Sequence, residues 1–105
     1  MSVHDLFPYL HVKNAEAAIK FYIKAFGVRE KLRLTEPSGR IGHAELDFGG
    51  TTLMLADEYP EYGLRGAEPS GPTFVTIHLH VDNADETIQR CSHEHLLPFI
   101  EARQR

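Results

Sequence analysis

The stretch Leu10-His11-Val12-Lys13-Asn14-Ala15 returns later in the chain as Leu79-His80-Val81-Asp82-Asn83-Ala84. The two copies are offset by 69 residues, which is 80 minus 11. A repeat at such an offset indicates one supersecondary unit present twice. The second copy is short, because residue 105 corresponds to Glu36 of the first copy, and the segment 37–57 has no counterpart. We therefore expect one complete unit, a partial second unit, and a second chain that completes the sheet.

Composition and charge are those of an ordinary globular protein. With 105 residues, 42% hydrophobic and 25% charged, the chain fits one domain with a modest core. The net charge of −4 argues against a nucleic-acid partner, because such proteins carry basic patches. No apolar run approaches the ~20 residues of a membrane span. The N-terminus lacks a secretory pattern, so a cytoplasmic location is expected. Cys91 is the single cysteine, which excludes an intrachain disulfide and predicts a buried, inert thiol.

The first half of the chain predicts a strand, a helix and three further strands. Residues 6–12 predict the first strand, and Asn14 can cap the helix that apolar residues at helical spacing extend to Phe26. Gly27 suits the left-handed position that ends a helix. Three more strands are predicted, over residues 29–35, 41–48 and 51–56. Gly49-Gly50 is the expected hairpin turn before the last of them.

The second half predicts a linker followed by a partial copy. Residues 58–72 are rich in Gly, Pro and Glu, which favours a linker or a flap. A strand over 73–81, a helix capped by Asn83 and a last strand over 97–103 complete the chain, and Pro98 restricts that strand to an edge or its first residues. The predicted fold is α+β in a single domain, 1–105, with a complete βαβββ module over 3–57 and a partial module over 73–105.

The element order and three stretches of sequence resemble the vicinal oxygen chelate superfamily, which includes glyoxalase I, extradiol dioxygenases and bleomycin-resistance proteins. The stretches are Pro8-Tyr9-Leu10-His11-Val12, Ala18-Ile19-x-Phe21-Tyr22-x-x-Ala25-Phe26-Gly27 and Gly42-His43-Ala44-Glu45-Leu46. The resemblance covers about residues 3–91, is nearest to the PhnB-like branch, and is lost in the tail 92–98. Because the family continues through three more strands, we expect a truncated or rearranged member.

The resemblance also implies where metal ligands would stand. Members that are metalloenzymes place one ligand on each of four strands, and three of these positions fall on Phe7, Met54 and Thr76. The fourth is expected to be missing with its strand. A phenyl ring and a thioether cannot replace histidine and glutamate at a divalent cation. The resemblance therefore implies the fold without the usual metal.

Strand alternation groups the candidate ligand-binding residues by face. Residues two apart on a strand point to the same side, and the resemblance implies that one side lines a cleft. The ligand-binding residues expected on that side are Phe7, Tyr9, His11, Met54, Thr76, His78 and His80. If the hairpin pairs as expected, the same side also carries His43, Glu45 and Thr52. The loop tyrosines Tyr59 and Tyr62 either close over a ligand or pack on the sheet edge.

Two chemical interpretations of these residues stay open. A relocated metal site would use His78 and His80 together with His43 or Glu45, and the alternative is a set of partly exposed, hydrogen-bonded strand residues. His43 and Glu45 are also the catalytic candidates, as a general acid/base pair for proton abstraction, against an ordinary hydrogen bond on a sheet face. The segment His93-Glu94-His95 is interpreted as a solvated helix end.

The leading hypothesis is a metal-free small-molecule-binding protein that needs no cofactor and holds an apolar or aromatic ligand in a cleft at the module or dimer interface. A second is a metal-dependent lyase, isomerase or dioxygenase whose ligands come from His11, His43, Glu45, His78 and His80. A third is a truncated, catalytically inactive family member. The expected partner is a second copy of the chain, in a homodimer formed with or without exchange of the segment 73–105.

Overall fold

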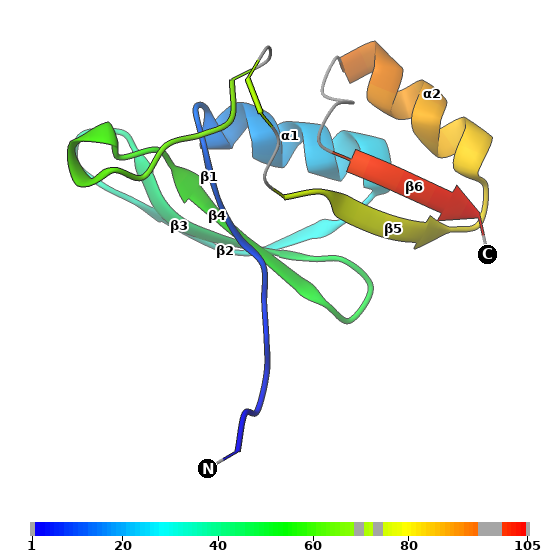
Figure 1. Cartoon of the computed structure of the whole chain (residues 1–105), viewed down its shortest axis with the longest axis horizontal. Helices are drawn as coiled ribbons and strands as arrows, with labels where there is room; N and C mark the ends of the chain where they lie inside the picture. The colour runs from blue at the N-terminus through cyan, green and yellow to red at the C-terminus, as the bar shows by residue number, and fades with distance from the viewer. Residues whose placement is uncertain (1, 69–70, 73–74, 95–99, 105) are drawn as a thin grey trace.

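The computed structural model describes residues 2–68, 71–72, 75–94 and 100–104. The chain forms two sheets and two α-helices that pack together (Figure 1). In chain order the elements are β1 (Tyr9–Val12), α1 (Ala15–Phe26), β2 (Arg29–Thr35), β3 (Ile41–Asp47), β4 (Thr52–Asp57), the 3₁₀-helix η1 (Pro60–Tyr62), β5 (Ile77–Val81), α2 (Ala84–Glu94) and β6 (Ile100–Gln104). The predicted α+β class and the βαβββ order are confirmed.

The main sheet has the strand order β1-β4-β3-β2. β1 runs parallel to β4, whereas β4, β3 and β2 pair in antiparallel fashion, so the helix crossover carries the chain from β1 to the far edge. The pairing of β2 with β3 is bulged at two points, where the register shifts after Glu30 and again after Leu34. The predicted β3–β4 hairpin is confirmed, because Gly49 and Gly50 take positive φ angles of 68° and 100° at its turn.

Two capping residues set the limits of α1. The Asn14 side-chain oxygen accepts a hydrogen bond from the Ala17 amide at 3.0 Å, and Gly27 ends the helix with φ 66°. The apolar stripe of α1 then packs on one face of the main sheet. The core that results contains Ile19, Phe21, Tyr22, Leu46, Leu53 and Leu55. Ala44 and Leu46 face this core, as the alternation in β3 predicts.

The second module repeats the first only in part. Asn83 caps α2 by accepting a hydrogen bond from the Glu86 amide at 3.0 Å. α2 packs beside α1 and brings Cys91 into the core, where it is 1% exposed (Figure 1). This exposure confirms the prediction of a buried Cys91, and the burial raises the pKa of its thiol. No helix within the described ranges is long and apolar enough to cross a bilayer.

β6 differs from what the resemblance implied. The register pairs His78 with Glu101 in parallel strands, as it pairs Tyr9 with Met54 in the first module. Because 78 minus 69 is 9, β6 stands beside β5 in the place that β4 holds beside β1. The backbone position that was expected to be missing is therefore supplied by the last strand of this chain.

Strand ends also differ from the sequence expectation. β1 begins at Tyr9 rather than at residue 6, because Pro8 has no amide hydrogen for the ladder and contributes only its carbonyl, which accepts from the Met54 amide at 3.0 Å. The last strand covers 100–104 instead of 97–103. The predicted restriction by Pro98 lies outside the described residues.

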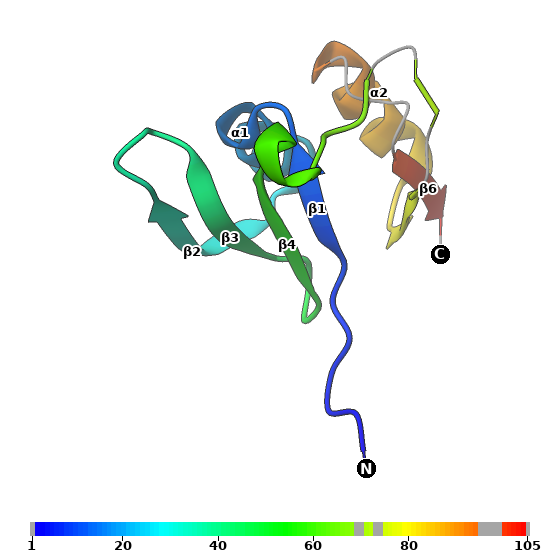
Figure 2. The same ribbon diagram turned by 60° about the vertical axis from the view of Figure 1, so that its left-hand side comes forward.

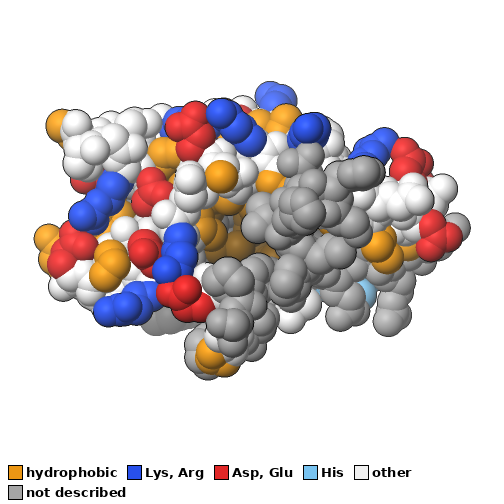
Figure 3. Space-filling view, turned by 90° about the horizontal axis from the view of Figure 1, so that it is seen from above, with side chains coloured by type: hydrophobic (Ala, Val, Ile, Leu, Met, Phe, Trp, Pro, Cys, Tyr) orange, Lys and Arg blue, Asp and Glu red, His pale blue; other side chains and the backbone are white. Residues whose placement is uncertain are grey.

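The predicted linker is a loop fastened to the first module. The Glu58 amide donates to the Val12 carbonyl at 2.7 Å, and the Glu58 carboxylate accepts from the Gly66 amide at 2.9 Å. Gly66 lies so close to β1 that an added Cβ would stand 2.6 Å from the Lys13 nitrogen. Figure 3 shows acidic and basic side chains interspersed over the upper surface of the molecule.

Candidate functional site

One face of the main sheet is covered by α1, and the opposite face carries none of the described elements (Figure 2). The register places Leu32 opposite Glu45 and Leu34 opposite His43, and it pairs Met54 with both Glu45 and Tyr9. Paired residues point to the same side of a sheet. We call this side the open face, and its residues are Tyr9, His11, Leu32, Leu34, His43, Glu45 and Met54.

A chain of hydrogen bonds crosses the open face. The Tyr9 hydroxyl lies 2.8 Å from His43 Nδ1, and His43 Nε2 lies 2.8 Å from Glu45 Oε2. The His43 and Glu45 side chains are each 23% exposed, so this chain is half-buried. Burial and the negative charge of Glu45 both raise the pKa of Tyr9, which keeps its phenol protonated.

Apolar side chains surround this polar chain. Leu34 is 56% exposed, Leu32 39% and Tyr9 45%, on a sheet whose other face packs against α1. The Tyr9 ring also lies 5.4 Å, centroid to centroid, from the His11 ring and from the His43 ring. The open face therefore offers apolar and aromatic contact area around three linked polar groups.

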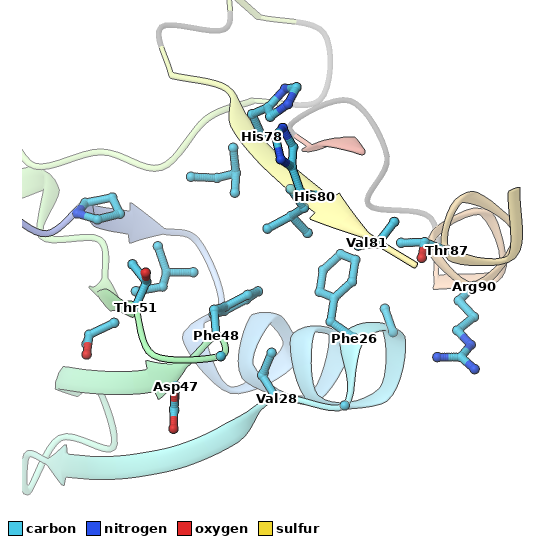
Figure 4. A pocket seen from close by; sticks show the side chains of 18 of the residues that line it. Phe26, Val28, Asp47, Phe48, Thr51, His78, His80, Val81, Thr87 and Arg90 are labelled. Carbon is cyan, nitrogen blue, oxygen red and sulfur yellow. The ribbon is translucent and has the colours of Figure 1, made fainter. Parts of the chain in front are cut away.

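A groove of about 990 Å³ adjoins the open face and separates the first module from β5 and α2 (Figure 4). Phe26 points from α1 toward β5, while His78 and His80 project from β5 with ring centroids 5.0 Å apart (Figure 4). Thr52 and Asp47 line the hairpin end of the groove. They are a cross-strand pair, two residues along from the pair of Met54 and Glu45, so the groove and the open face meet there.

The structure divides the predicted site residues into two sets. Tyr9, His11, His43, Glu45 and Met54 share the open face, whereas the groove is lined by Thr76, His78 and His80. Phe7 precedes β1 and is 40% exposed. Of the segment His93-Glu94-His95, the first two residues close α2 and His95 lies outside the described residues.

Sequence reasoning missed Leu32 and Leu34. In a sheet with one packed face, alternating leucines are expected to point into the core. The bulged register of β2 places them on the open face instead, and no local sequence signal reveals that register. It also missed the aromatic wall of the groove, where the Phe26 and Phe48 rings lie 5.9 Å apart.

The loop tyrosines lie away from the groove, which neither of them lines. Tyr59 donates a hydrogen bond to Glu36 in the β2–β3 turn, and Arg40 lies over its ring at 4.6 Å from the centroid. The Glu36 contact raises the pKa of Tyr59 to about 12. Arg40 also pairs with Glu61 at 2.7 Å. These contacts fasten η1 to the turn, and the ring of Tyr62 stands 77% exposed beside it.

The donor set does not fit the metal that the resemblance associates with this fold. The described residues contain no group of three or more His, Cys, Asp or Glu side chains placed to hold a metal ion. His78 and His80 consequently do not form such a group with His43 or Glu45. Phe7, Met54 and Thr76, at three of the implied ligand positions, offer a ring, a thioether and a hydroxyl, which are poor ligands for Mn²⁺ or Zn²⁺.

Comparisons with known proteins agree with this architecture. The chain is 43% identical over 88 residues to uncharacterized protein Rv0887c of Mycobacterium tuberculosis, which covers 81% of this chain and 52% of the relative. It thus spans about half the length of that relative.

Among solved structures, the match to protein PA1353 from Pseudomonas aeruginosa covers 98% of this chain and 100% of the PA1353 chain, with TM-score 0.67 and 19% identity. A variant of the fosfomycin resistance protein FosX from Listeria monocytogenes, complexed with Mn(II) and 1S,2S-dihydroxypropylphosphonic acid, covers 90% of this chain and 74% of its own, with TM-score 0.66 and 14% identity. The Glyoxalase/Bleomycin resistance protein/Dioxygenase superfamily matches residues 6–103, and the chain belongs to this superfamily.

Proposed function

We propose that this protein binds an apolar or aromatic small molecule on the open face, without a metal. The observation that carries the proposal is an amphipathic sheet with one face packed by α1 and the other lined by the exposed side chains of Leu32, Leu34 and Tyr9 beside the partly buried Met54. Apolar side chains gathered on one surface favour a contact that removes them from water. The adjoining groove extends the surface available to a larger ligand.

The hydrogen-bond chain supports binding over proton abstraction. Both ring nitrogens of His43 already have a partner, one in Tyr9 and one in Glu45. The raised pKa of Tyr9 makes its phenol a poor acid near neutral pH, and catalysis of proton transfer works best when the pKa lies near the working pH. We therefore assign Tyr9, His43 and Glu45 to ligand positioning.

The metal-free part of the proposal rests on the residues at the implied ligand positions. Two of them, Phe7 and Thr76, stand before β1 and β5 rather than in the strands, and Met54 carries a thioether. Thermal melts with and without Mn²⁺, the ion of the FosX complex, test this directly. Equal melting temperatures are expected. A rise that saturates at one Mn²⁺ per chain would favour a metal-dependent lyase, isomerase or dioxygenase.

Binding itself can be measured with Nile red, a neutral aromatic dye whose fluorescence rises in apolar surroundings. Folded protein should give a saturable signal. Leu34→Gln should weaken it severalfold without lowering the melting temperature, because Leu34 is exposed. Leu64→Gln is the matched control, since Leu64 is also exposed but lies in the loop after η1. If both variants weaken Nile red binding equally, or if the folded protein gives no saturable signal, the binding proposal is contradicted and the hypothesis of an inactive family member is favoured.

We also propose a homodimer. β2 is an edge strand of the main sheet, and such edges and open faces recruit another chain. Sedimentation at micromolar concentration should give twice the mass of the chain, and a stable monomer would contradict the proposal. Nile red binding by a monomer would leave the binding function intact.

A further inference from the structure

The hydrogen-bond chain on the open face has a fixed direction. A carboxylate can only accept, so the hydrogen between His43 Nε2 and Glu45 Oε2 belongs to the imidazole. A neutral imidazole carries one N–H group, which leaves a lone pair on Nδ1. The Tyr9 hydroxyl therefore donates its hydrogen to His43, over the 2.8 Å contact. Glu45 thus determines which way the Tyr9 hydroxyl points.

This direction leaves the Tyr9 oxygen as an acceptor. Its other polar neighbour is the Gly42 carbonyl at 3.4 Å, which is an acceptor too and competes for the same hydrogen. Neither neighbour donates to the phenol oxygen. The raised pKa of Tyr9 favours the neutral phenol, so its hydroxyl hydrogen stays available to His43.

The surroundings specify the rest of the ligand. Met54 stands beside Tyr9 in register, and the His11 ring lies 5.4 Å from the Tyr9 ring. Flat apolar surface next to an aromatic ring favours an aromatic ligand. The negative charge of Glu45 further favours a ligand group that presents positive charge or a polar hydrogen.

We propose that the open face selects aromatic ligands that carry an N–H or O–H donor over ligands of the same shape that carry only an acceptor. The inference rests on the proposed binding function and names its ligand class. Tyr9 receives the donor, and Glu45 acts through His43 as a positioning residue.

Indole and benzofuran form the probe pair, because they share size and shape but differ in an N–H donor against an oxygen acceptor. Amide chemical shifts of labelled protein, titrated with each fragment at pH 8.5 where imidazoles are neutral, report both affinity and location. Indole should bind about three- to tenfold more tightly than benzofuran, the effect of one hydrogen bond. The shifted amides should be those of β1, β3 and β4 around the open face.

Single substitutions then identify which side chains cause the preference for indole over benzofuran. Tyr9→Phe should abolish it, because the loss of the phenol oxygen weakens the binding of indole more than that of benzofuran. Glu45→Gln should reduce it, because an amide can either accept from His43 or donate to it, and the Tyr9 hydroxyl loses its fixed direction. Tyr62→Phe, on the exposed loop, should change neither affinity. Melting temperatures near wild type establish that each variant is folded.

The outcomes separate the two proposals. Equal binding of both fragments would overturn the donor preference and leave the binding function standing. A preference that survives Tyr9→Phe would also overturn it, because another group would then receive the donor. If neither indole nor benzofuran shifts any amide of the open face, in a dimer or a monomer, both proposals are overturned. Shifts confined to 76–81 would overturn the open face as the site and place the ligand in the groove.

Discussion

Asp57 joins three elements of the first module, and removing its carboxylate should cost several kcal/mol of stability. Oδ1 accepts from the Ala15 amide at 2.7 Å, and Oδ2 accepts from the Ile41 amide at 2.7 Å. Both donors belong to buried residues, 0% and 2% exposed. A hydrogen bond to a charged group contributes about 1.5–3 kcal/mol, so Asp57→Ala should lower the free energy of unfolding by about 3–6 kcal/mol.

A loss of this size is a large part of the ~5–15 kcal/mol that holds a small domain folded. Urea unfolding followed by circular dichroism gives the free energy, with an unchanged slope if only stability is affected. Asp57→Asn keeps one acceptor and should lose about half as much. It serves as the measurable variant if Asp57→Ala does not fold.

Asp47 provides the matched comparison. Its carboxylate also makes two hydrogen bonds, with the Gly50 amide at 3.0 Å and Arg29 at 3.3 Å, but both are exposed. Asp47→Ala should therefore lower the free energy of unfolding far less than Asp57→Ala does. If Asp57→Ala and Asp47→Ala lose the same free energy, the reasoning from buried, unsatisfied amides is refuted.

Three further predictions test the core and the loop. Burial raises the pKa of Tyr22 to about 12 from 10.0, so the unfolded chain loses this proton first and stability should fall as pH rises from about 10 to 12. Tyr22→Phe should remove on the order of 2 kcal/mol of that fall in alkaline urea titrations. Gly66→Ala should destabilise the protein and open the loop to limited proteolysis, because its Cβ would strike the Lys13 backbone, and an unchanged melt would contradict the contact. Cys91 should react with a thiol reagent only when the protein unfolds, and rapid labelling of native protein would show that it is not buried.

Local signals in the sequence were enough to predict the elements of the first module. Asn14 and Gly27 limit α1 through bonds that lie within a few residues, and Gly49 and Gly50 supply the positive φ angles of a hairpin. Such features are decided by the chemistry of neighbouring residues. The face shared by His43 and Glu45 followed from alternation for the same reason.

Features that depend on distant contacts could not be predicted in this way. Leu32 and Leu34 reach the open face because of bulges in the pairing of β2 with β3. Composition alone predicts a linker over the loop 58–68. In the structure Glu58 holds this loop in place, because its amide donates to Val12 of β1 and its carboxylate accepts from Gly66 of the loop itself. The groove exists because α2 packs on α1, and its Phe26 wall looks like ordinary core in the sequence.

The polar groups of the open face are compatible with a dry contact. A ligand that covers this face removes water from every group beneath it, and an unpaired buried polar group costs about 1–3 kcal/mol. Tyr9, His43 and Glu45 already pair with one another through two bonds of 2.8 Å, so covering them leaves the Tyr9 oxygen and the second carboxylate oxygen of Glu45 as acceptors to be matched. At the hairpin end, by contrast, Asp47 pairs with Arg29 in an exposed contact. The dry part of the face should therefore centre on Tyr9, and the hairpin end should stay wet in the complex.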